Sequence, residues 1–324
     1  MTRSQVGHLL LCLGVAAGAI AFQGVVHCPR GSMWWSAVFD LGHVPLFGVL
    51  ALMILQASRL LWRGRSRSGW RHYGAALVVS VLVSGLTELA QYVGPRDADP
   101  RDVIRNVIGV VAMLLLARSR DGDRGGRWCM RVIAAGLVMI VSIPVATLTV
   151  AYRQRDAAFP RICDFEHGWE TTFLHTQDAD LAREAAAAEK GDGMAGRLTF
   201  RPATYPGLSF VEPHPDWRGY DQLVFEVYSD ADTALALAVR IDDGEHDQRY
   251  WDRFNRRLTI QPGANRIAID LAEVEQAPRG RRMDMTNVRN ITLFAVEPEE
   301  PFTVYVDAVR LEMNRSQRLS RSSR

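Results

Sequence analysis

Lysine is almost absent from this chain of 324 residues: Lys190 is the only one, so nearly all of the positive charge is arginine. This disfavours Schiff-base chemistry, which needs a lysine amine. The four cysteines include no pair with zinc-site spacing, and the chain has neither a Gly-x-x-x-x-Gly-Lys phosphate loop nor a Gly-x-Ser-x-Gly motif. The sequence thus gives no support to a lysine-dependent, zinc-dependent or serine-hydrolase mechanism.

The average composition conceals two different halves. A mean hydropathy of −0.05 and a formal charge of +2 would suit a soluble protein. Up to Tyr152, however, long apolar stretches alternate with short arginine-rich links, whereas later residues form short alternating runs. We therefore predict two parts: an all-α transmembrane bundle and an all-β domain.

Five segments have, or nearly have, the roughly 20 apolar residues that a helix needs to cross a bilayer. They are residues 6–26, 41–62, 73–93, 101–117 and 131–152. The fourth is the most polar, so we expect it inside the bundle. An alternative for the first segment is a cleaved signal peptide, because Arg3 precedes an apolar stretch that ends in small residues.

The arginines predict the orientation. Two links are rich in them, 63–71 and 118–131, and positively charged short loops stay in the cytoplasm. The N-terminus is then cytoplasmic and the C-terminal half extracytoplasmic, which means periplasmic if the cell has an outer membrane. We predict a four-span domain at 1–120, a basic cytoplasmic link with a fifth span at 121–155, an extracytoplasmic sandwich at 156–313 and a basic disordered tail at 314–324.

This topology gathers polar residues from three segments at one membrane depth on the outer side. Within each segment they are three or four residues apart and therefore share a helix face. Charges that face lipid are costly, so we expect the three faces to converge. The predicted polar site consists of Asp40, His43, Glu88, Gln91, Arg96, Asp102, Arg105 and Asn106.

The order of these residues resembles the VanZ-like family of membrane proteins. The matching elements, over about residues 5–120, are Asp40-x-x-His43, Glu88-x-x-Gln91, Arg96, Asp102, Asn106 and Gly109. The family is named for a protein associated with resistance to a glycopeptide antibiotic. The resemblance implies a role in the cell envelope and supplies no reaction.

Several residues in and near this site also fit purely structural roles. Asp99 and Pro100 fit a helix start, and Gly109 fits a close helix contact. Glu88 can form an ion pair with Arg96 or Arg105. In a catalytic arrangement, His43 would act as acid or base with Glu88, oriented by Asp40 or Glu88, while Arg96 or Arg105 holds a phosphate or carboxylate.

Beyond Tyr152, nine short runs with alternating apolar residues predict strands, separated by turns such as Pro262-Gly263. They fall near 162–166, 196–201, 207–212, 223–228, 234–241, 257–261, 266–271, 290–296 and 302–311. Many short strands at this spacing favour a two-sheet sandwich or jelly roll. The alanine-rich stretch 178–190 predicts one helix.

This half resembles galactose-binding-like sandwiches of the carbohydrate-binding-module type. The matching segments are 205–208, 216–221, 223–228, 250–255, 262–265 and 304–311. Trp217 and Tyr220 fit packing positions better than a sugar platform. Aromatic faces beside hydrogen-bonding groups suit a sugar, and this makes candidates of Asp242, His246, Tyr250, Trp251 and Arg253. A solvated loop is the alternative.

Two further predictions concern the soluble half. Sandwiches of this type often hold a structural calcium, for which Glu166 and Asp307 offer carboxylates. Apart from this ion we expect no cofactor. Cys28 and Cys163 both fall outside the membrane, where a disulfide between them is predicted.

Two functional hypotheses remain. In the first, a non-enzymatic envelope protein binds a glycan with its sandwich and recognises a lipid head group, a cell-wall component or a glycopeptide antibiotic with its polar site. In the second, a membrane enzyme acts on a lipid-linked or cell-wall substrate through His43 and Glu88. The lack of a clear nucleophile or metal set favours the first. Membrane lipids and a glycan are the expected partners, and nucleic acid is not.

Overall fold

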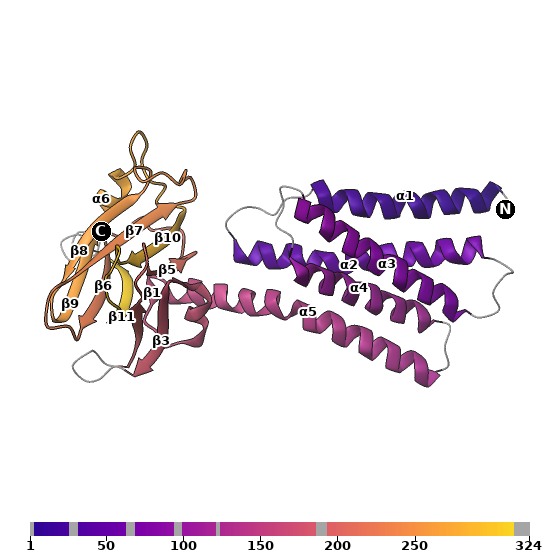
Figure 1. The fold of residues 1–324 in the computed structure, drawn as a ribbon, viewed down its shortest axis with the longest axis horizontal. Coiled ribbons are helices and arrows are strands. Elements are labelled where there is room, and N and C mark those ends of the chain that lie inside the picture. The colour runs from indigo at the N-terminus through magenta and orange to yellow at the C-terminus, as the bar shows by residue number, and fades with distance from the viewer. Residues whose placement is uncertain are drawn as a thin grey trace, which may run out of the picture. The chain divides into compact units, whose positions relative to one another are not determined.

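The computed structural model describes residues 3–25, 32–62, 69–93, 99–120, 124–185 and 193–313. The chain divides into two compact units, residues 1–148 and 149–324, whose elements are drawn in Figure 1. Each unit is described by itself. Cys28, Arg96 and the tail at 314–324 lie outside the described residues, as does the side chain of Gln91.

Helices build the first unit, and they fall where the apolar segments predict them. They are α1 (Arg3–Val25), α2 (Met33–Leu61), α3 (Trp70–Val93), α4 (Pro100–Arg118) and the larger part of α5 (Arg124–Ala158). The start of α4 is confirmed in detail. Asp99 is the N-cap and accepts a hydrogen bond from the Arg101 backbone at 2.9 Å, and Pro100 occupies the first turn.

Packing in this unit centres on α2, which contacts α1, α3 and α4, while α3 also contacts α4. The buried core consists of Phe47, Leu50, Ala51, Leu55, Ala76, Val110 and Leu114. Gly109 allows the closest approach, because a Cβ atom there would lie 2.2 Å from the Val44 carbonyl oxygen. The predicted role of Gly109 as a helix contact is therefore confirmed.

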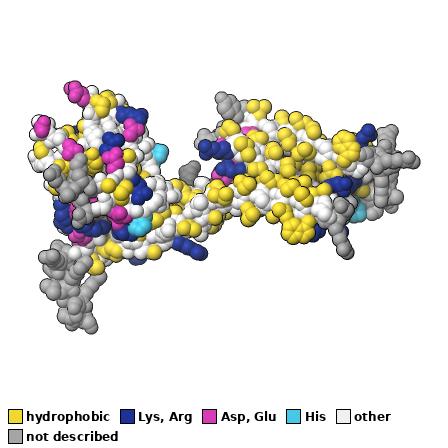
Figure 2. All heavy atoms as spheres, turned by 90° about the horizontal axis from the view of Figure 1, so that it is seen from below, with side chains coloured by type: hydrophobic (Ala, Val, Ile, Leu, Met, Phe, Trp, Pro, Cys, Tyr) yellow, Lys and Arg dark blue, Asp and Glu magenta, His cyan; other side chains and the backbone are white. Residues whose placement is uncertain are grey.

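Three of the helices are long and apolar enough to cross a membrane: Met33–Leu61, Trp70–Ala90 and Gly125–Ala158. The described part of α1 adds a shorter apolar segment, Gln5–Gly18. In Figure 2, hydrophobic side chains cover most of the visible surface of the helices. On α3, Leu82 and Leu86 are more than 60 % exposed. Such surfaces indicate a multi-pass membrane protein.

Two antiparallel sheets form the second unit. The first has the order β3-β4-β11-β6-β9, with β1 also paired to β11; the second has the order β2-β5-β10-β7-β8. The strands are β1 (Arg161–Cys163), β2 (Leu174–Gln177), β3 (Ala179–Ala185), β4 (Met194–Phe200), β5 (Gly207–Val211), β6 (Gln222–Ser229), β7 (Leu235–Asp243), β8 (Phe254–Ile260), β9 (Gly263–Asp270), β10 (Val288–Phe294) and β11 (Phe302–Glu312). The predicted two-sheet sandwich is confirmed.

Alternating apolar residues from both sheets fill the space between them. On β7, for example, Leu237, Val239 and Ile241 are buried in the common core, so the residues between them face outward. Trp217 is completely buried and Tyr220 packs at the edge of the core. Both therefore serve packing, as predicted.

The helix predicted at 178–190 is wrong over residues 179–185, whereas 186–190 lie outside the described residues. Residues 179–185 form β3, which pairs antiparallel with β4 from Ala179 opposite Phe200 to Ala185 opposite Met194. Pairing with a neighbouring strand overrides the helix propensity of the alanines. The sequence also missed β2, a short 3-10 helix at Gly168–Phe173 and a short helix, α6 (Leu271–Gln276), which Asp270 caps.

Candidate functional site

Three helices of the first unit meet at Asn106. Its Oδ1 atom lies 3.0 Å from His43 Nδ1 on α2, and its Nδ2 atom donates to Ser84 Oγ on α3 at 2.9 Å. Asn106 is completely buried. A buried amide with partners on two other helices fixes how those helices pack, and it holds the His43 ring in place.

A charged network surrounds the histidine. His43 Nε2 lies 3.6 Å from Asp102 Oδ2. The Arg105 guanidinium contacts Asp102 on the same helix, lies 3.0 Å from Asp40 on α2 and is 3.8 Å from Asp99. One arginine therefore lies within ion-pair distance of three carboxylates. This arrangement favours a structural role for Arg105 over capture of a phosphate or carboxylate ligand.

Glu88 lies on α3 and is 9 % exposed. Among the described residues, neither of its carboxylate oxygens has a hydrogen-bond partner. The predicted ion pair with Arg105 is not formed there, because Arg105 is engaged by aspartates. A pair with Arg96 falls outside the described residues. A buried carboxylate without a partner is costly, so among the described residues Glu88 is a candidate to bind a ligand or a proton.

The structure brings together five of the eight predicted site residues: Asp40, His43, Asp102, Arg105 and Asn106. Sequence reasoning missed Ser84 as a member. Its position four residues before Glu88 places it on the same helix face, and this spacing was the available signal.

The candidate glycan site lies on the outward face of the second sheet. Asp242, at the end of β7, is 3 % exposed. Its Oδ1 atom accepts from Asn290 Nδ2 at 2.7 Å, and its Oδ2 atom lies 3.3 Å from Arg240 Nε. Nearby, the Arg253 guanidinium lies 5.6 Å from the centre of the Tyr250 ring. The face thus combines an aromatic ring with fixed polar groups.

Two tyrosines border this face and are open to solvent. Tyr250 is 67 % exposed and Tyr205 is 56 % exposed, and the Tyr205 ring packs edge-on against Phe294 of β10. Burial lowers the pKa of Arg253, followed by repulsion from Arg240; Asp242 and both tyrosines act in the opposite direction. These residues therefore lie close enough for their charges to interact.

The other two glycan candidates have different surroundings. The His246 side chain is 5 % exposed, and its Nδ1 atom lies 2.9 Å from the Asp252 carbonyl oxygen. The His246 side chain therefore stabilises the loop in which it lies. Trp251 is 49 % exposed, and its carbonyl accepts from the Arg279 backbone at 2.9 Å.

Arg281 braces the loop that carries these aromatics. Its guanidinium reaches Asp243 Oδ2 at 2.6 Å and Asp252 Oδ1 at 2.6 Å. Hydrogen bonds to Arg281 hold the pKa of Asp252 down at about 2. No local sequence pattern predicts this link, since Arg281 is far from both aspartates along the chain. It fixes the two ends of the segment that contains Tyr250.

Glu166 and Asp307 fit the predicted calcium site chemically. Glu166 Oε1 accepts from the Met194 backbone at 2.6 Å, and Asp307 Oδ1 accepts from Ala308 at 2.6 Å. Burial raises the pKa of Asp307 to about 6, and repulsion from Glu226, Asp164 and Glu166 adds to this. Calcium prefers carboxylate oxygens, but among the described residues Glu166 and Asp307 do not belong to a group of three or more convergent ligand side chains. The calcium site stays a prediction.

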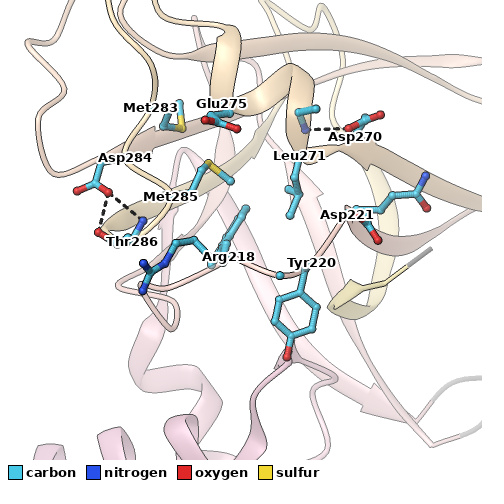
Figure 3. Close-up of a pocket in the computed structure, with 14 residues that line it drawn as sticks. Arg218, Tyr220, Asp221, Asp270, Leu271, Glu275, Met283, Asp284, Met285 and Thr286 are labelled. Carbon is cyan, nitrogen blue, oxygen red and sulfur yellow. Dashed lines mark hydrogen bonds between the residues drawn. The ribbon is translucent and has the colours of Figure 1, made fainter. Parts of the chain in front are cut away.

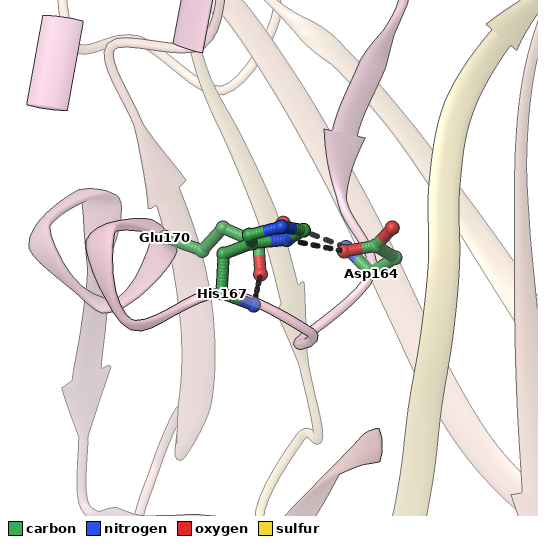
Figure 4. A group of neighbouring side chains, drawn as sticks. All are labelled: Asp164, His167 and Glu170. Carbon is green, nitrogen blue, oxygen red and sulfur yellow. Dashed lines mark hydrogen bonds and ion pairs between the residues drawn. The ribbon is translucent and has the colours of Figure 1, made fainter. Parts of the chain in front are cut away.

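Among the described residues, two groups of side chains converge closely enough to attract a cation: Asp164-His167-Glu170 and His246-Asp247-Asp252. In the first (Figure 4), Glu170 is buried and accepts from the backbone of Asp164 at 3.1 Å and of His167 at 3.0 Å. In the second, Asp252 is paired with Arg281. Protein donors thus hold these carboxylates, so we assign neither group to a metal.

A cavity of about 680 Å³ opens at the edge of the sandwich and contains none of the glycan candidates. Its walls come from residues 217–222, 270–272 and 283–286, together with Glu275 (Figure 3). Asp284 accepts from the Thr286 backbone at 2.9 Å and from its hydroxyl at 2.6 Å, and these bonds lower the pKa of Asp284. Asp270 is used as the cap of α6.

Cys163 is a free cysteine in the described part of the chain, and its predicted partner Cys28 lies outside the described residues, so the disulfide stays a prediction. Its side chain is 1 % exposed and belongs to the sandwich core, so a partner sulfur would have to enter that core. Burial also raises the pKa of the thiol. Cys163 therefore behaves as a small apolar core residue.

Comparison with known proteins separates the two parts of the chain. Residues 12–120 match the VanZ/LLP1 family. Beta-agarase B of Vibrio sp. (strain JT0107) is 30 % identical over 144 residues, which are 40 % of this chain and 13 % of that protein. The chain thus corresponds to a small part of that relative's length.

Several solved structures are similar to the sandwich at low sequence identity. An exo-beta-agarase has a TM-score of 0.39 and 17 % identity, with 48 % of this chain and 25 % of the agarase covered. The family 11 carbohydrate-binding module of Clostridium thermocellum has a TM-score of 0.37 and 17 % identity, covering 47 % of this chain and 94 % of the module. Residues 12–120 are thus a VanZ/LLP1 domain, and a β-sandwich similar to carbohydrate-binding modules follows in the same chain.

Proposed function

We propose that this protein is a non-enzymatic component of the bacterial cell envelope that holds a glycan-binding sandwich at the membrane. One observation carries the proposal: the outward face of the second sheet places two exposed tyrosines beside Arg253, Arg240 and the buried Asp242. Sugars bind where a ring can stack while fixed polar groups meet the hydroxyls. The Vibrio relative is named as an agarase, which acts on a glycan.

In this proposal the sandwich faces outward. The arginine-rich links at 63–71 and 118–131 favour a cytoplasmic N-terminus, and the sandwich follows the last span. The helical unit then presents its polar site to the outer leaflet, where a lipid head group, a cell-wall component or a glycopeptide antibiotic is its ligand. Binding of the full-length protein to a panel of glycans tests the sandwich; an envelope-antibiotic susceptibility assay with His43→Ala and Glu88→Ala tests the polar site.

The alternative is a membrane enzyme acting on a lipid-linked or cell-wall substrate. It is favoured by the position of His43, held between Asn106 at 3.0 Å and Asp102 at 3.6 Å, and by the buried carboxylate of Glu88. A carboxylate that orients a histidine is a common acid–base arrangement. Turnover of a lipid-linked cell-wall precursor that is lost in His43→Ala, with normal membrane insertion, would support this alternative over the first.

A further inference from the structure

Positive charge dominates the outward face of the second sheet. The registers place Arg240 of β7 opposite Thr292 of β10 and Asn255 of β8, with Ser209 of β5 opposite Thr292 on the far side. Arg257 lies on the same face, because its neighbour Leu258 is buried in the core. Ser209, Thr292, Arg240 and Asn255 thus form a polar row across four strands.

Carboxylates are scarce on this face. Asp242 and Asp243 are the only acidic residues in β2, β5, β7, β8 and β10. Asp243 is held by Arg281 at 2.6 Å. Within these strands Asp242 is then the one acidic residue left beside Arg240 and Arg257, and in the described part of the chain only Arg240 lies at ion-pair distance from it.

Polar atoms on the same face are buried without hydrogen bonds. Among the described residues, this is true of Arg240 Nε, Arg253 Nε, Asp242 Oδ2 and Asn255 Oδ1. A buried donor without an acceptor is destabilising, because it has lost its hydrogen bond to water. Arg253 Nε has no hydrogen-bond partner among these residues, and Arg240 Nε has only the ion pair with Asp242 at 3.3 Å. The face therefore has capacity for a further acceptor, and an anionic one would also neutralise excess charge.

We infer that the face binds an acidic glycan, with a carboxylate or sulfate group of the sugar held by Arg253 and Arg240 and a sugar ring against Tyr250. Planar guanidinium groups match the paired oxygens of such anions. This inference rests on the proposed glycan-binding function and adds the charge of the ligand. The source of the negative charge, uronate or sulfate ester, is decided by the probes below.

The test uses the full-length protein in nanodiscs of phosphatidylcholine, a lipid without net charge. Calorimetry at physiological salt compares two matched pairs of oligosaccharides: homogalacturonan with free or methyl-esterified carboxylates, and a galactan with or without sulfate esters. We expect the acidic member of at least one pair to bind roughly tenfold more tightly, the size of a charge-assisted hydrogen bond. Arg253→Gln and Arg240→Gln should lose this preference and keep the binding of the neutral member.

Controls separate this site from general attraction to polyanions. Arg201→Gln removes one exposed arginine that pairs with Asp180 outside this sheet, and it should keep the preference. Arg253→Lys keeps the charge without the planar fork and should show an intermediate preference. Circular dichroism establishes that each variant is folded. Equal affinity for acidic and neutral members, unchanged by the variants, overturns the inference and leaves glycan binding intact. No binding to any member overturns both.

Discussion

His43 Nδ1 lies 3.0 Å from Asn106 Oδ1, so a hydrogen bond joins α2 to α4 inside the helical unit. Asn106 continues the connection to α3 through Ser84 at 2.9 Å. The polar residues of the family motif thus hold three helices together as well as forming a candidate site. Structural and functional effects of substitutions there must be separated by experiment.

Asn106→Ala should destabilise the helical unit. It removes hydrogen bonds to two helices and leaves Ser84 and His43 without this partner, which in a membrane bundle costs about 1–2 kcal/mol. Unfolding of the protein by sodium dodecyl sulfate in mixed micelles measures the change. Ser142→Ala is the control, since that exposed hydroxyl bonds only the Val138 carbonyl of its own helix at 2.8 Å. A stable Asn106→Ala would show that the three-helix junction is not needed for packing.

Gly109→Ala should separate α4 from α2. The new Cβ atom would lie 2.2 Å from the Val44 carbonyl oxygen, which is backbone and cannot rotate away. Overpacking of this kind costs about 1–3 kcal/mol. Gly136→Ala on α5 has no atom within 4 Å of the new methyl and should be neutral or slightly stabilising. The same unfolding measurement compares them, and equal stability of the two variants would contradict the close contact.

Arg281→Gln should destabilise the sandwich and weaken glycan binding together. The Asp243 side chain is 0 % exposed and would lose its charge partner, a change that costs about 3 kcal/mol or more when an ion pair is buried. Thermal unfolding followed by near-ultraviolet circular dichroism measures the loss. Arg282→Gln, at a side chain that is 76 % exposed, should change stability by less than about 0.5 kcal/mol. If both variants behave alike, Arg281 does not brace the loop.

Stability of the sandwich should depend on the protonation of Asp307. Its folded pKa of about 6 is above the ordinary 3.8, so the folded state binds the proton more tightly than the unfolded state does. The resulting stabilisation is fully present below about pH 4 and is lost as the pH rises through 6. Asp307→Asn should remove this part of the pH dependence in chemical unfolding between pH 4 and 7; an unchanged profile would exclude Asp307 as its source.

If Glu166 and Asp307 bind calcium, the ion should counter the loss of sandwich stability that accompanies ionisation of Asp307. At pH 7 the ion would neutralise the two carboxylates, and a ligand that binds only the folded state raises the melting temperature. We expect a rise with calcium in the parent protein that is absent in Asp307→Asn. Magnesium serves as the control, because it tolerates irregular sites poorly. A melting temperature that is independent of calcium would remove the metal prediction.

Much of this architecture could be predicted from local patterns. Apolar length located the helices, and Asp99-Pro100 located the start of α4, because both signals depend on neighbouring residues. The strand β3 could not be predicted in this way. Its alanines favour a helix locally, and only pairing with β4, a partner later in the chain, makes them a strand.

The sites were predictable to a similar extent. Helix spacing brought His43, Asp102 and Asn106 into one cluster, as the structure confirms. Arg240 and Asn290 were missed, because their meeting with Asp242 depends on the strand order β10-β7-β8 and its register. Sheet order depends on contacts between distant parts of the chain, so local patterns in a single sequence do not predict it.

Glycan binding by full-length protein carrying Tyr250→Ala tests the central claim most directly. Tyr305→Ala is the matched control, because Tyr305 packs edge-on with Tyr228 on the other sheet. Calorimetry with the best ligand from a glycan panel should show at least about tenfold weaker binding for Tyr250→Ala, given the energy of an aromatic contact that is removed. Tyr305→Ala should bind like the parent. Equal affinity of all three proteins, or no glycan bound by the parent, would contradict a glycan site on this face.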